Sequence, residues 1–183
     1  MSQQDKLLGE KRRAFILDLL RQSAAPVTGQ ILAEKTNVSR QIIVQDISLL
    51  KAAGEPIIAT ARGYLYIREN RDNKKRRIIA VCHPPEYTAR ELYLIVDYGV
   101  SVINVIVEHP VYGDLTGSLM LHNRHDVDQY LRRMEETGAS LLSNLTDGVH
   151  LHTIEAATEE QLDKVVEALK KEGILLETIT NAG

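Results

Sequence analysis

Apolar residues in the first third of the chain recur at helical spacing and predict short helices. Between residues 11 and 20 they form one face suited to burial, made by Ala14, Phe15, Ile16, Leu17, Leu19 and Leu20. The charged residues of this segment are expected in solvent: Arg12, Arg13, Asp18 and Arg21. This pattern predicts a first helix over residues 11–20.

Two more helices are predicted on either side of a tight turn. Pro26 ends the preceding segment, and Thr28 is a suitable N-cap for a helix over residues 29–35. After the turn at Thr36-Asn37, Ser39 is a suitable N-cap for a third helix. The inward face of that helix carries Ile43, Ile47 and Leu50. Two helices joined by so short a turn predict a helix-turn-helix.

Two β-prone runs follow Pro56 in the segment IIATARGYLYI. They meet at Arg62-Gly63, where glycine can adopt a positive φ, so the segment predicts a hairpin that forms the wing of a winged helix. Residues 69–77 are almost wholly polar or charged and predict a linker. We therefore expect a winged helix-turn-helix DNA-binding domain over residues 1–68 and a second domain over residues 78–183.

The second domain alternates strand and helix patterns. The predicted strands cover residues 77–82, 101–108, 115–121, 148–155 and 174–178, and the predicted helices cover 88–98, 125–136 and 158–171. This order contains a split β-α-β core with an added helix and strand. The expected fold class is α+β, with a sandwich-like α/β second domain.

The charge of the chain is divided unevenly between the two parts. Residues 1–77 contain 15 Lys and Arg against 8 Asp and Glu, whereas residues 78–183 contain 7 against 17. A basic part followed by an acidic part suggests that the first meets phosphate and the second senses a ligand.

Several protein classes are excluded by simple features of the sequence. The chain has no run of eighteen apolar residues and no N-terminal apolar stretch with a cleavage site, so we expect neither a membrane span nor secretion. A single cysteine, Cys82, excludes an internal disulfide framework. These features predict a cytoplasmic protein.

The outward face of the third predicted helix carries side chains that suit base recognition. The N-terminal residues of such a helix face the major groove. Arg40 can bind a guanine edge with two hydrogen bonds, and Gln41 or Gln45 can pair with adenine. The expected DNA contacts are Ser39, Arg40, Gln41, Val44, Gln45 and, in the wing, Arg62. The alternative is a solvated face in a winged helix that binds protein.

Histidines in the second domain suggest a metal site. His150 and His152 lie two residues apart on a predicted strand, so both point to the same face of the sheet. His83 ends an earlier strand, and Pro84-Pro85 turn the chain before the helix that carries Glu91. Three imidazoles and a carboxylate suit a divalent metal such as zinc, nickel, iron or manganese.

A structural interpretation competes with the metal site at Glu91. The segment from Thr88 to Glu91 fits a capping box, in which the glutamate only closes the helix N-terminus. The segment EHPVYGDL is also open to two interpretations. Its polar residues His109, Tyr112 and Asp114 could hold a small ligand, or they could make ordinary hydrogen bonds within a turn.

Four stretches of the chain resemble those of a known family. The stretches VSRQIIVQDISLLKA, PIIAT, EHPVYGDL and LTDGVHLHT are similar to signatures of the bacterial niacin-responsive repressors of NAD biosynthesis and niacin uptake. The resemblance covers almost the whole chain and implies a winged helix followed by a 3H domain, named for three histidines. It further implies a homodimer that binds operator DNA, with nicotinic acid as corepressor.

The resemblance also assigns residues to roles. It implies that the regulatory domain binds a metal through three histidines and a glutamate, which correspond here to His83, Glu91, His150 and His152. We expect the effector to contact His109, Tyr112 and Asp147.

Two other functions compete with the niacin-responsive repressor. A metal with an open coordination position could activate water in an enzyme, but the sequence lacks a phosphate-binding glycine loop and a nucleophile elbow. In a metal sensor, the ion itself would be the signal. We therefore expect a repressor and no enzymatic activity.

Overall fold

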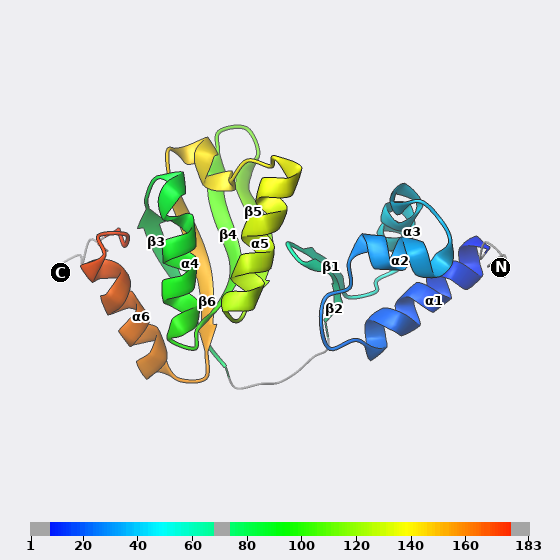
Figure 1. Ribbon diagram of the computed structural model, residues 1–183, viewed down its shortest axis with the longest axis horizontal. Coiled ribbons are helices and arrows are strands. Elements are labelled where there is room, and N and C mark those ends of the chain that lie inside the picture. The colour runs from blue at the N-terminus through cyan, green and yellow to red at the C-terminus, as the bar shows by residue number, and fades with distance from the viewer. Residues whose placement is uncertain (1–7, 68–73, 177–183) are drawn as a thin grey trace. The chain divides into compact units, whose positions relative to one another are not determined.

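The computed structural model describes residues 8–67 and 74–176. The chain forms two compact units, residues 1–70 and residues 71–183 (Figure 1). Each unit has its own core and is described separately below.

The N-terminal unit is a winged helix-turn-helix. Its elements are α1 (Gly9–Gln22), α2 (Gly29–Thr36), α3 (Arg40–Ala52), β1 (Ile57–Thr60) and β2 (Gly63–Tyr66). The predicted caps are confirmed, because the Thr28 hydroxyl accepts from the Ile31 N–H and the Ser39 hydroxyl accepts from the Ile42 N–H. Asn37 turns the chain between the two helices in the left-handed conformation. The core includes Ile16, Leu20, Leu32, Ile43, Ile47 and Leu50.

Arg12 does not face solvent, so that part of the sequence prediction is wrong. It is 8% exposed, and its Nε donates to Oδ2 of Asp46 at 2.5 Å. Asp46 belongs to α3 and is itself buried. Helical periodicity could not reveal a partner 34 residues away, and this ion pair fixes α1 against α3.

The wing joins the helices through a close backbone contact. Tyr64 of β2 and Val27 exchange two backbone hydrogen bonds of 2.8 and 2.9 Å. Gly63 precedes this pair with φ of +137°, and a Cβ at that position would lie 2.6 Å from the Val27 carbonyl oxygen. Only glycine allows the wing to approach the helical part this closely.

The C-terminal unit is a four-stranded sheet with helices on one face (Figure 1). Its strands are β3 (Lys75–Cys82), β4 (Ser101–His109), β5 (Gly113–Leu121) and β6 (Val149–Ala156), and its helices are α4 (Thr88–Asp97), α5 (Arg124–Thr137) and α6 (Glu159–Lys171). Two short 3-10 helices are η1 (Pro85–Tyr87) and η2 (Leu142–Thr146). The strand order is β3-β6-β4-β5 and every neighbouring pair is antiparallel. β3 and β4 thus run parallel with β6 between them, as a split β-α-β unit requires.

The two ends of the C-terminal unit differ from the sequence prediction. β3 begins at Lys75, two residues before the predicted start, and residues 69–73 of the expected linker lie outside the described residues. The strand predicted at residues 174–178 is, as far as the described chain reaches, one bridge between Leu175 and Val81. Residues 177 and 178 of that predicted strand lie outside the described residues.

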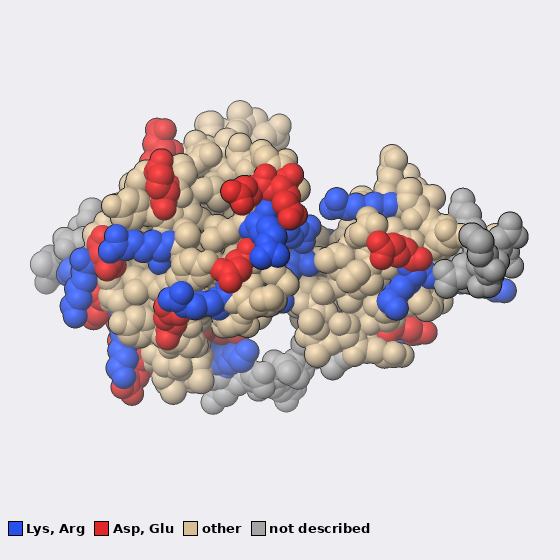
Figure 2. Space-filling model, viewed as in Figure 1, with Lys and Arg blue, Asp and Glu red and all other residues tan. Residues whose placement is uncertain are grey.

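Charges on the helical face of the C-terminal unit are mixed in sign. Arg77 pairs with Glu159 at 2.9 Å, and Arg124 pairs with Asp97 at 2.5 Å. Figure 2 shows basic and acidic side chains interspersed over this face, so its acidic excess forms no single patch there. None of the helices described in either unit is long and apolar enough to cross a bilayer.

Candidate metal centre and DNA-reading helix

His83 lies directly after β3 and is 6% exposed. Its backbone N–H points to the Gly148 carbonyl oxygen at 3.4 Å. Gly148 has φ of +91°, and a Cβ there would lie 2.4 Å from the His83 carbonyl oxygen. Only glycine permits this contact, so the turn before β6 holds His83 beside the start of that strand.

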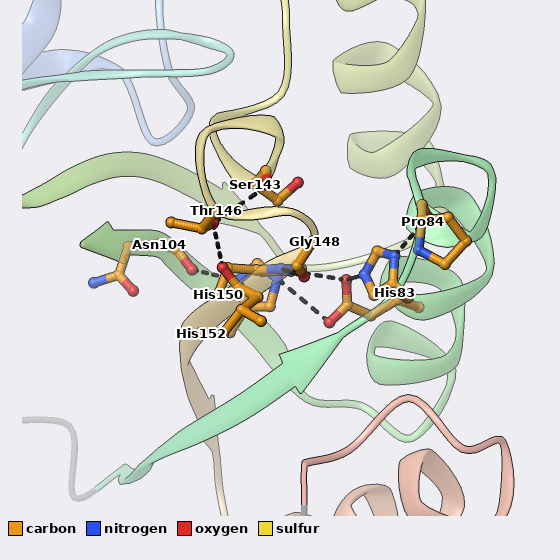
Figure 3. A network of polar contacts seen from close by, with 10 residues as sticks. His83, Pro84, Asn104, Ser143, Thr146, Gly148, His150 and His152 are labelled. Carbon is orange, nitrogen blue, oxygen red and sulfur yellow. Dashed lines mark hydrogen bonds and ion pairs between the residues drawn. The ribbon is translucent and has the colours of Figure 1, made fainter. Parts of the chain in front are cut away.

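The central strand β6 supplies two more buried imidazoles. His150 and His152 lie two residues apart, so their side chains point to the same face of the sheet. In the pairing of β6 with β3, His150 is the register partner of Val81 and His152 that of Ile79. The ring centroid of His150 lies 5.0 Å from that of His83 and 4.8 Å from that of His152. Three imidazoles therefore gather where β3 ends and β6 begins (Figure 3).

Glu91 enters this cluster from the first turn of α4 and is 1% exposed. Its Oε2 lies 2.7 Å from Nε2 of His83 and 3.4 Å from Nε2 of His150. Its other oxygen, Oε1, lies 3.5 Å from Nε2 of His152. One carboxylate thus faces the same nitrogen of all three rings.

The capping-box interpretation of Glu91 is wrong. The N-cap of α4 is Tyr87, and no side chain makes a cap hydrogen bond there. The buried Thr88 hydroxyl has no hydrogen-bond partner among the described residues. Glu91 turns toward the imidazoles and leaves the helix N-terminus without a side-chain acceptor.

Each imidazole is oriented by a backbone carbonyl that contacts its Nδ1 (Figure 3). The three contacts are His83 with Pro84 at 2.9 Å, His150 with Gly148 at 2.9 Å and His152 with Asn104 at 2.6 Å. A carbonyl oxygen can only accept, so each Nδ1 must carry a proton. In the neutral ring, each Nε2 then presents a lone pair to the carboxylate.

This convergence of acceptors has electrostatic consequences. Burial lowers the pKa of His83, but its hydrogen bonds to Glu91 and Pro84 outweigh burial and raise that pKa above its ordinary value. Burial also lowers the pKa of His152, but the charge of Glu91 outweighs it and the pKa is again raised. Burial favours neutral Glu91, yet the charge of His152 and the polar contacts with the three rings hold its pKa well below the usual range. Without a metal, protons must therefore balance the carboxylate.

The donor set also fits a divalent metal. Ligand atoms of His83, Glu91 and His150 lie within 4.8 Å of one another, and His152 faces the second carboxylate oxygen. That oxygen is buried and has no hydrogen-bond partner in the described chain. Imidazoles anchored at Nδ1 with Nε2 free are typical metal ligands, and a set of nitrogens and one carboxylate suits zinc, nickel, iron or manganese.

The three expected effector residues lie in turns or at the end of a strand. His109 ends β4, and its Nδ1 accepts from the backbone N–H groups of Val111 and Tyr112. Tyr112 is 74% exposed and packs its ring on His109 at 4.9 Å. Asp147 is exposed, and its backbone adopts the left-handed conformation at the end of η2. The structure gives His109 and Tyr112 a role in shaping the β4–β5 hairpin, and it does not bring these residues into the imidazole cluster.

The predicted reading face of α3 is available to a partner. Ser39, Arg40, Gln41, Val44 and Gln45 are all exposed. Ile43, Asp46, Ile47 and Leu50 are buried and hold the opposite face of the helix. Arg62 lies in the two-residue turn between β1 and β2 and is half-buried, so it reaches outward less than expected.

The comparisons with known proteins agree with this architecture. Residues 12–65 match a helix-turn-helix domain family, and residues 76–178 match the 3H domain family. The transcription repressor NadR of Bacillus subtilis (strain 168) is 49% identical over 178 residues, which covers 96% of this chain and 99% of the relative. The probable transcription repressor NiaR of Thermotoga maritima is 41% identical over 172 residues, covering 94% and 97%.

The chain belongs to this family of 3H-domain transcription repressors. The resemblance inferred from the signature stretches is confirmed. Membership places the chain among DNA-binding regulators and not among enzymes. It also explains why an exposed polar helix and a buried imidazole cluster occur in one chain.

Sequence reasoning missed how the repressor orients His152. The pairing of β4 with β6 shifts between Val102 and Asn104, which indicates a bulge. Beyond it, the Asn104 carbonyl meets Nδ1 of His152, and the Asn104 side chain accepts from the Thr153 N–H at 3.0 Å. A polar Asn104 within the apolar run VINVIV was the local signal that could have indicated this bulge.

Proposed function

We propose that this repressor binds operator DNA as a homodimer and controls genes of NAD biosynthesis and niacin transport. Nicotinic acid is the corepressor, and a divalent metal held by His83, Glu91, His150 and His152 belongs to the regulatory site. The names of the relatives support transcriptional repression, and the signature stretches support the niacin response. The observation that carries the regulatory part is the convergence of three Nε2 atoms on Glu91.

The recognition helix supports operator binding. Its exposed N-terminal residues can contact bases, with Arg40 suited to guanine and Gln41 or Gln45 suited to adenine. A single helix-turn-helix covers only one half-site, and two copies on one palindrome would read it in full. This is the reason for proposing a homodimer.

The metal would act by organising the regulatory site. When bound, it supplies a positive charge and a coordination position that a carboxylate or pyridine nitrogen can take. The carbonyls at Nδ1 hold the rings so that Nε2 stays available. Glu91 supplies the negative charge that balances the ion.

Metal sensing is the second candidate, because the same cluster could respond to the ion alone. The two functions are separated by titrating a labelled promoter fragment with the full chain, metal-loaded or metal-free, in the presence or absence of nicotinic acid. Corepression predicts that nicotinic acid tightens operator binding roughly 5-fold to 150-fold, the range of a typical coupling free energy. Binding that follows the metal and ignores nicotinic acid would establish the sensor instead. Turnover of nicotinic acid would point to an enzyme.

A further inference from the structure

A small cavity adjoins the imidazole cluster inside the C-terminal unit. Its volume is about 20 Å³, which is room for about one water molecule. Apolar walls come from Leu92, Val105, Leu119, Leu141 and Leu142. Its polar groups come from His150, His152, Glu91, Thr88, Tyr130 and Ser143. The cavity therefore combines apolar walls with a polar end.

Thr88 offers this cavity an unused hydroxyl. Its Oγ1 is buried, and no group in the described chain accepts or donates a hydrogen bond there. A buried hydroxyl without a partner destabilises the protein, so an added acceptor would be favoured. Tyr130 also lines the cavity and carries a second hydroxyl. Both hydroxyls can donate to an anion.

The cavity shares two lining residues with a groove on the surface. Thr88 and Leu141 also line a surface groove of about 310 Å³ between the start of α4 and the end of α5. Leu141 follows the exposed residues 138–140 and precedes η2. Displacement of its side chain would join the cavity to the groove without breaking the sheet.

A second groove lies near the β4–β5 hairpin but suits an anion poorly. It has a volume of about 480 Å³, it also touches His150, and its other lining residues include Glu108, Pro110 and Asp114. Two carboxylates there would repel a third on the ligand. The cavity that Thr88 lines has one carboxylate, that of Glu91, whose charge a bound metal would balance, so it is the better receptor for an anionic ring.

We propose that the cavity beside the imidazoles is the effector pocket, and that it opens by movement of Leu141. It takes a planar six-membered ring bearing a carboxylate, which accepts a hydrogen bond from the Thr88 hydroxyl. The proposed function enters only in naming nicotinic acid as that ring. The pocket requires opening because about 20 Å³ cannot hold such a ring.

Calorimetry on the full-length, metal-loaded protein tests the pocket. Thr88→Val removes the hydroxyl at nearly constant volume, Thr88→Ser keeps it, and Glu108→Gln alters the competing groove. Each protein is titrated with nicotinic acid and with benzoic acid, and its metal content is measured. Thr88→Val should bind nicotinic acid about 10-fold to 100-fold more weakly, the effect of losing one hydrogen bond to a charged group. Thr88→Ser and Glu108→Gln should stay close to wild type, and the metal content should not change.

The other outcomes separate the pocket from the proposed function. If nicotinic acid does not bind but benzoic acid binds and depends on Thr88, the pocket stands and the corepressor is misidentified. If the bound acid is indifferent to Thr88, or if neither acid binds, the pocket assignment is overturned. Weaker or stronger binding by Glu108→Gln, with Thr88→Val unchanged, would move the site to the hairpin groove.

Discussion

Asp46 in the N-terminal unit and Glu91 in the C-terminal unit are both buried carboxylates on helices, and they differ in what surrounds them. Asp46 of the N-terminal unit is 2% exposed and meets the guanidinium of Arg12 at 2.5 Å, with Arg13 at 3.5 Å. Glu91 of the C-terminal unit is 1% exposed and meets three imidazoles. The Nδ1 protons of those imidazoles are already taken by backbone carbonyls.

The difference shows how a buried carboxylate can be structural in one place and functional in another. Arginine is always charged and carries only donors, so Asp46 is satisfied by the chain itself. A neutral imidazole that faces the carboxylate with Nε2 presents a lone pair, so Glu91 is balanced only when protons or a metal ion are added. A buried carboxylate among acceptors is therefore a binding site for a cation.

The largest expected effect comes from removing two of the imidazoles. His150→Ala/His152→Ala should lower the metal content from one ion per chain to near zero, because half of the ligand set is lost. Elemental analysis of the purified protein measures this. His122→Ala/His125→Ala, which removes two exposed histidines of the same unit, should keep the full metal content. Unchanged stoichiometry in the first variant would show that the metal lies elsewhere.

Breaking the Asp46 pair should affect stability and leave the metal in place. Asp46→Ala leaves Arg12 buried without its carboxylate, and the loss of one partner of a buried pair typically costs about 3 to 5 kcal/mol. Hydrogen exchange of α1 and α3 reports unfolding of the N-terminal unit directly. The exposed Asp18→Ala should change stability by no more than about 0.5 kcal/mol. Equal protection in both variants would mean that the Arg12 pair contributes nothing to the fold.

A smaller effect is expected at the DNA-reading surface. Arg40→Ala should weaken binding to the specific operator by about 1 to 3 kcal/mol if the arginine binds guanine with two hydrogen bonds. Binding to unrelated DNA should change less, because only the base contact is specific. Fluorescence anisotropy at moderate salt compares the two. Equal affinity of wild type and variant for the operator would show that Arg40 makes no specific contact with a base.

The smallest effect is a shift in the pH dependence of metal binding. In the metal-free protein the pKa of His83 and of His152 lies above the ordinary value of 6.5. Protons therefore occupy these rings at higher pH than they would in free histidine, and the metal must displace them. Metal affinity should be greatest at high pH. As the pH is lowered, it should begin to fall before the pH reaches about 6.5. A fall that begins only below about pH 6 would contradict the raised pKa values.

Features that depend on spacing within one helix or strand could be predicted from the sequence. Caps at Thr28 and Ser39, the exposed face of α3 and the shared face of His150 and His152 all follow from spacing within one element. The split β-α-β core follows in the same way from the order of strands and helices.

Features that depend on distant pairing could not be read in this way. The Arg12–Asp46 pair joins residues 34 apart, so the sequence gives no local sign of it. The Thr88–Glu91 spacing fits a capping box, and only the packing of α4 on the sheet turns Glu91 inward. The cavity beside the imidazoles depends on side chains from α4, α5, β4, β5, β6 and η2, which have no common sequence signature.

X-ray absorption spectroscopy of the full-length protein loaded with zinc is the most direct test of the metal centre, because it reports the atoms bound to the ion. We expect nitrogen and oxygen ligands at about 2.0 to 2.2 Å, with the multiple scattering of about three imidazoles. The His150→Ala/His152→Ala variant should lose that imidazole signal. A wild-type spectrum without imidazole scattering would contradict the assignment of this cluster as the metal centre.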